Sequence, residues 1–116
     1  MTYQEIYTML STIDRGGSLG NIPAVMTAWP IGSVPDFPYI VFTYPENDDI
    51  IADNYNYVKR VQLNIELYTD NFDPDTAKLI EDTLDAHRLS YQKTTEWLES
   101  EKMYETLFIT EVLLNA

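Results

Sequence analysis

The chain has 116 residues, a formal net charge of −12 from 19 acidic and 7 basic residues, and 45% hydrophobic residues. This length fits one ordinary domain, 1–116, which can form a single core without disulfides. The absence of cysteine excludes disulfide scaffolds, zinc sites built on thiolates and cysteine nucleophiles. A single histidine, His87, excludes any site that needs two imidazoles from one chain.

The charge distribution argues against direct binding of nucleic acid. Proteins that bind DNA neutralise its phosphates with lysine and arginine, but neither residue occurs between Arg15 and Lys59. The apolar runs are too short to span a bilayer, and residues 1–5 lack the features of a signal peptide. We therefore expect a protein of the cytoplasm with no membrane partner.

The first third of the chain predicts one helix and two strands. Thr2 and Glu5 have the spacing of a capping box, and apolar residues then recur at helical intervals until Gly16-Gly17 ends the helix. A short strand is expected within 24–29. Three prolines make 30–38 irregular, and the β-branched and aromatic run 39–44 predicts a strand.

The rest of the chain predicts a polar acidic loop over 45–56, then a strand, a helix and two more strands. From Val61 to Tyr68 apolar and polar residues alternate, which is typical of a strand with one buried face. Asp73-Pro74 begins the second helix, where we expect His87 on the apolar side. The two last strands, 91–98 at an edge and 102–114 in the interior, are joined by a hairpin turn.

This order predicts an α+β fold. We expect a mixed, mostly antiparallel sheet of four to five strands, with two helices packed on one face. We find no internal repeat and no linker in the sequence.

No motif in the sequence predicts an enzyme. The acidic loop contains Glu46, Asp48, Asp49 and Asp53, whose oxygens could hold calcium or magnesium, but it lacks the spacing and the glycine of an EF-hand. We expect a solvated loop and no metal or other cofactor, with a metal shared between subunits as the alternative. Tyr55 and Tyr57 predict aromatic contacts within the fold or with a partner rather than stacked bases.

The sequence from Pro38 onward resembles the tail-completion, or tail-terminator, proteins of long-tailed phages and prophages of Gram-positive bacteria. Five segments carry the resemblance: 38–42 (PYIVF), 53–57 (DNYNY), 61–70 (VQLNIELYTD) with Asp73-Pro74, 91–93 (YQK) and 99–105 (ESEKMYE). The resemblance spans about two-thirds of the chain, from Pro38 onward, and the N-terminal helix carries no signature of this family.

The resemblance implies a structural protein with no catalytic residues, located in the host cytoplasm and then in the virion. It implies a ring, with six copies as the expected number, that binds the tail tube protein and the head-completion protein while DNA passes through. On this basis we expect Glu46, Asp48, Asp49 and Asp53, with Tyr55 and Tyr57, on a loop at the lumen or the neighbouring subunit. Two alternatives are a connector adaptor on the portal side and an acidic DNA mimic that inhibits a host enzyme.

Overall fold

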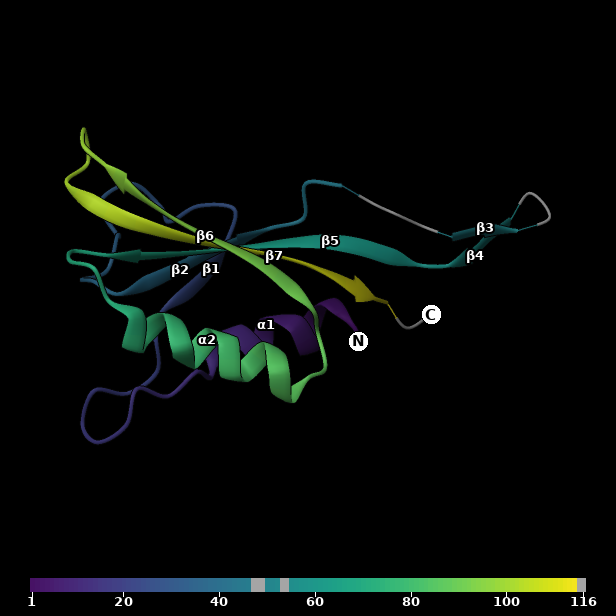
Figure 1. The fold of residues 1–116 in the computed structure, drawn as a ribbon, viewed down its shortest axis with the longest axis horizontal. Coiled ribbons are helices and arrows are strands. Elements are labelled where there is room, and N and C mark those ends of the chain that lie inside the picture. The colour runs from purple at the N-terminus through teal and green to yellow at the C-terminus, as the bar shows by residue number, and fades with distance from the viewer. Residues whose placement is uncertain (47–49, 53–54, 115–116) are drawn as a thin grey trace.

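The computed structural model describes residues 1–46, 50–52 and 55–114, with the backbone only for 50–52 and 55–58. Two helices lie against one face of a five-stranded sheet, and a two-stranded hairpin projects from one end (Figure 1). The expected α+β fold, with its mixed and mostly antiparallel sheet, is therefore confirmed. None of the helices in the described part of the chain is long and apolar enough to cross a membrane.

The sheet has the order β1-β2-β5-β7-β6. Its strands are β1 (Ala24–Met26), β2 (Tyr39–Thr43), β5 (Arg60–Thr69), β6 (Tyr91–Leu98) and β7 (Met103–Leu113). β1 is parallel to β2, and the other neighbouring strands are antiparallel. β7 lies between β5 and β6, and β6 forms an edge, as the sequence predicts.

The core lies between the sheet and the two helices. Along β5 the side chains of Val61, Leu63, Ile65 and Leu67 are buried, while the intervening side chains on the other face are partly exposed. Phe42 of β2 and Phe108 of β7 are also completely buried on the helix side. The alternation read in the sequence therefore separates a covered face from an open face.

Helix α1 (Tyr3–Ser11) begins at the predicted capping box. The Thr2 hydroxyl accepts the backbone N–H of Glu5 at 3.1 Å, and the Glu5 carboxylate accepts the backbone N–H of Thr2 at 3.0 Å. The helix ends at Ser11, before the predicted stop at Gly16-Gly17. Ile6, Met9 and Leu10 are its buried residues, which fix α1 to the sheet.

Helix α2 (Pro74–Ala86) begins after Asp73, as predicted. The Asp73 carboxylate accepts the backbone N–H of Thr76 at 3.1 Å and its hydroxyl at 2.7 Å, and Pro74 occupies the first turn. Ala77, Ile80 and Leu84 face the core. An N-cap and an apolar stripe therefore place α2 under the β5–β7–β6 side of the sheet.

The prediction of a loop over residues 45–56 is wrong in part. Residues 50–52 and 55–58 form two short antiparallel strands, β3 (Ile50–Ala52) and β4 (Tyr55–Val58), that pair only with each other. We call this hairpin the arm. It extends beyond the end of the five-stranded sheet, close to the line of β5 (Figure 1).

Candidate interaction surfaces

Of the residues predicted for the lumen or a subunit contact, the structure describes three, Glu46, Tyr55 and Tyr57, which lie beside or in the arm. Glu46 is exposed at its base, where its backbone carbonyl accepts the N–H of Gln62 at 2.9 Å. Asp48, Asp49 and Asp53 lie outside the described residues. Tyr55 and Tyr57 belong to β4, which corrects the prediction that they lie on a loop.

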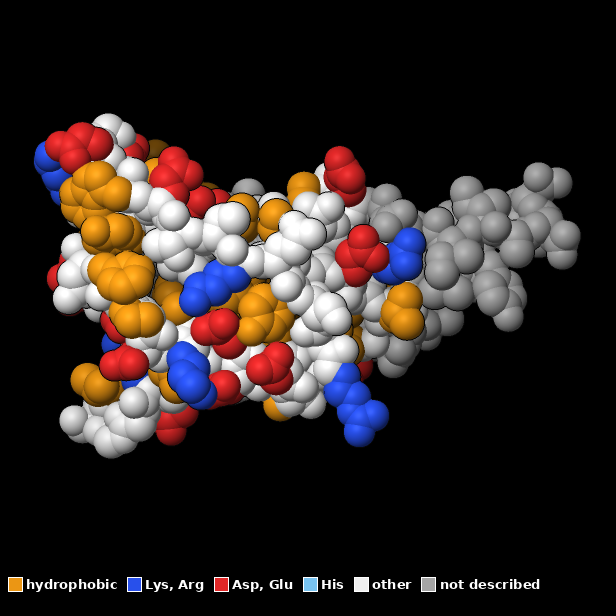
Figure 2. Space-filling model, viewed as in Figure 1, with side chains coloured by type: hydrophobic (Ala, Val, Ile, Leu, Met, Phe, Trp, Pro, Cys, Tyr) orange, Lys and Arg blue, Asp and Glu red, His pale blue; other side chains and the backbone are white. Residues whose placement is uncertain are grey.

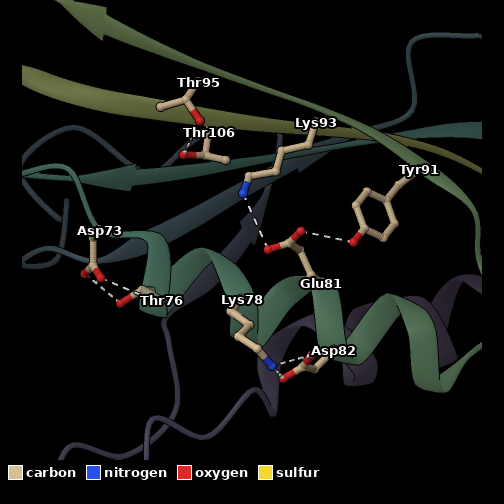
Figure 3. A network of polar contacts seen from close by, with 9 residues as sticks. All are labelled: Asp73, Thr76, Lys78, Glu81, Asp82, Tyr91, Lys93, Thr95 and Thr106. Carbon is tan, nitrogen blue, oxygen red and sulfur yellow. Dashed lines mark hydrogen bonds and ion pairs between the residues drawn. The ribbon is translucent and has the colours of Figure 1, made fainter.

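A polar network joins α2 to the edge strand β6. The Glu81 carboxylate accepts the Tyr91 hydroxyl at 3.1 Å and the Lys93 ammonium at 3.4 Å (Figure 3). Next to it Lys78 and Asp82 form an ion pair at 2.9 Å on the exposed side of the helix. The Glu81 contacts orient β6 against the helix, whereas an exposed pair such as Lys78–Asp82 contributes little to stability.

A second polar cluster lies on the open face of the sheet. The Tyr68 hydroxyl is 2.9 Å from Oε2 of Glu105 and 3.2 Å from Oε1 of Glu66. Because a hydroxyl has one proton to donate, it can serve only one carboxylate at a time. Burial raises the pKa of Glu66, and Glu105 raises it further, although the hydrogen bond from Tyr68 acts in the opposite direction.

A group of aromatic rings lies on the surface where the β6–β7 hairpin turns. The Tyr104 ring is 4.8 Å from Trp97 and 6.0 Å from Phe72, between ring centroids. Phe72 is 65% exposed and Trp97 is 40% exposed. Figure 2 shows hydrophobic side chains gathered at this end of the molecule, next to the acidic and basic groups of the turn.

We call this region the turn end: the three rings together with residues 99–102. Part of this region could have been predicted from the sequence. The expected hairpin turn Glu99-Ser100-Glu101 places Trp97 and Tyr104 on opposite strands, and the two residues are paired in the structure. Phe72 is brought to them by the fold, so no sequence signal identifies the cluster. Such exposed aromatic groups are typical of surfaces that bind a protein partner.

At the opposite end of the sheet is a groove of about 990 Å³, which we call the basic groove. β6 begins at Tyr91, opposite Thr110, so residues 111–113 of β7 have a neighbouring strand only on the β5 side. The groove lies beside this stretch. Its lining includes Met1, Arg60, Arg88, Tyr91, Glu111 and Leu113.

The basic groove carries positive charge in a protein that is strongly negative overall. Among the described residues, its lining includes two arginines and the N-terminal residue but only one carboxylate, that of Glu111, which lies 3.1 Å from Arg60. Arg88 is exposed, and it forms no ion pair with any residue among those the structure describes. The sequence did not predict this site, because Arg60 and Arg88 are far apart in the chain.

His87 lies in the same groove, which corrects its predicted position on the apolar side of α2. It is the C-cap residue and is exposed, with Nδ1 2.9 Å from the backbone oxygen of Thr83. The apolar face of the helix ends one turn earlier, at Leu84, because the chain leaves the helix after Ala86. No group of three or more His, Asp or Glu side chains with the geometry of a metal site occurs in the described ranges.

No protein-family model matches this chain, and no curated protein sequence matches it. Membership of a tail-completion family therefore stays a prediction that rests on the five sequence segments. The surfaces described above are the structural basis for any assignment of function.

Proposed function

We propose that this chain is a structural protein of a phage tail, which forms a ring that caps the tail tube and joins it to the head. The observation that carries the proposal is the arm. Its two strands pair with each other and, in the part of the chain that the structure describes, with no strand of the body (Figure 1). An isolated two-stranded hairpin is only marginally stable in water, so a projecting arm favours a partner that packs against it.

Two further features support an assembled state. β6 is an edge strand of eight residues whose polar backbone groups are unpaired on one side, and exposed edges of this kind invite pairing with another chain. The turn end adds a group of aromatic rings at the surface. A ring protein needs two different surfaces that meet around an axis, and this molecule has distinct features at its two ends.

The acidic residues of segment 46–53 fit a channel for DNA. A lumen that carries Glu46, Asp48, Asp49 and Asp53 from every subunit would repel phosphates and let DNA pass without binding. This role needs no catalytic residue, metal or cofactor. It does need the tail tube protein and the head-completion protein as partners at the two openings of the ring.

Light scattering after size exclusion, with and without magnesium, tests the proposal together with electron microscopy. We expect closed rings of about six times the 13.4 kDa of one chain, and attachment to the ends of purified tail tubes. Rings that bind portal complexes instead would favour the connector adaptor. A monomer that ignores tail tubes and inhibits a nuclease would overturn the proposal in favour of the DNA mimic.

A further inference from the structure

The basic groove and the turn end have complementary chemistry. The groove presents Arg60 and Arg88 beside an exposed apolar residue, Leu113, which is 56% exposed. The turn end presents the carboxylates of Glu99 and Glu101 beside exposed aromatic rings. Each surface therefore combines a net charge with apolar area, and the two net charges have opposite signs.

The turn end also carries an acid that is not neutralised by a base. Lys102 pairs with Glu99, whereas Glu101 accepts only the hydroxyl of Ser100 among the described residues. Glu101 is thus the negative group most available to a cation from another molecule. On the other side Arg88 is the matching cation, because Arg60 already contacts Glu111.

One molecule cannot bring the two surfaces together. β7 begins at the turn end and finishes in the basic groove, and the steps between its eleven residues, at about 3.4 Å each, separate the two ends by about 34 Å. A chain therefore cannot fill its own groove with its own turn. A second copy can, because its turn end is free to approach.

We propose that the basic groove binds the turn end of a second copy of this chain, with Arg88 of one copy facing Glu101 of the other. The inference rests on the proposed function, since it names the surfaces by which the subunits of the ring associate. The contact joins different surfaces at opposite ends of the molecule, so it is heterologous. Repetition of such a contact gives a closed ring when the rotation between copies divides a full turn.

Charge reversal tests this contact in both partners. We expect Arg88→Glu and Glu101→Lys each to weaken self-association by about tenfold or more, because each places like charges together at the contact. An equimolar mixture of the two variants should assemble again. In the mixture the groove of the Arg88→Glu variant can bind the turn end of the Glu101→Lys variant, where the charges are again opposite. The groove of the Glu101→Lys variant keeps Arg88 and can bind the turn end of the Arg88→Glu variant, which keeps Glu101.

The mixture also separates this effect from misfolding, since a misfolded variant could not be rescued by another variant. Lys78→Glu and Asp82→Lys are matched controls, because they change the net charge by the same amounts at exposed sites on α2 that belong to neither surface. Light scattering or sedimentation gives the mass of each sample. We expect both controls to assemble like the unaltered chain.

Three results would overturn the inference, and they differ in what they say of the proposed function. Rings that persist in both variants would exclude this contact while leaving the ring itself supported. Loss of assembly in both variants without recovery in the mixture would show that the two residues do not meet. An unaltered chain that stays monomeric at every concentration, yet caps tail tubes, would mean that the groove does not bind a second copy.

Discussion

Glu66 is a carboxyl group whose ionisation is opposed by its surroundings in the sheet. Burial raises the pKa of this carboxyl, and the charge of Glu105 raises it further. The folded chain therefore holds the Glu66 proton more tightly than the unfolded chain. A raised carboxyl pKa contributes stability below the unfolded pKa, and that contribution is lost as the pH rises through the folded value.

Glu66→Gln should remove this pH dependence. The amide oxygen can still accept the Tyr68 hydroxyl, but the charge is gone. We expect equal free energies of unfolding for the variant and the original at about pH 4, and a variant more stable at pH 7 by about 0.5 kcal/mol or less, because solvent screens a half-buried side chain. Urea unfolding at both pH values measures this. The same difference in free energy of unfolding between variant and original chain at both pH values would contradict this prediction.

At the scale of the element, we expect the arm to be dispensable for folding and necessary for assembly. Among the described strands, β3 and β4 pair only with each other, so their removal leaves the pairing of the five-stranded sheet unchanged. We expect a chain in which Asn-Gly replaces residues 47–58 to keep a free energy of unfolding within about 1 kcal/mol of the original. The same chain should not form rings, because the arm is the projecting element that needs a partner.

A matched variant separates the arm's shape from its charge. Asp48→Asn, Asp49→Asn and Asp53→Asn keep the length of the segment and remove three carboxylates. We expect this triple variant to form rings, as measured by light scattering, whereas the shortened chain remains a monomer. Ring formation by the shortened chain would contradict the role given to the arm.

The elements that the sequence predicts well are those in which local pattern and tertiary burial agree. β5 alternates apolar and polar residues, and its buried residues are the apolar ones. The arm gives no such signal, because β3 and β4 are short and lie among asparagine and aspartate residues that usually favour turns. The basic groove and the Phe72 contact depend on segments that meet only in the fold, so the sequence alone could not identify them.

At the scale of the whole molecule, the net charge of −12 opposes the local attraction between the basic groove and the turn end. The two effects act over different distances. Repulsion between whole subunits is a long-range effect, and salt screens it once the Debye length falls to about 10 Å at 0.1 M. Contact between Arg88 and Glu101 acts over a few ångströms, so it persists until about 1 M salt, where the Debye length is about 3 Å.

Assembly should therefore depend on salt with a maximum rather than a steady trend. We expect the dissociation constant to fall as sodium chloride rises from about 10 mM to 0.15 M and to rise again towards about 1 M. Magnesium chloride should lower the dissociation constant at a much lower concentration than sodium chloride does, because a divalent cation screens carboxylates more strongly. Sedimentation across the salt series measures both the fall and the later rise of the dissociation constant. A dissociation constant that rises from the lowest salt onward would contradict the role of net charge, because attraction at the contact would then dominate throughout.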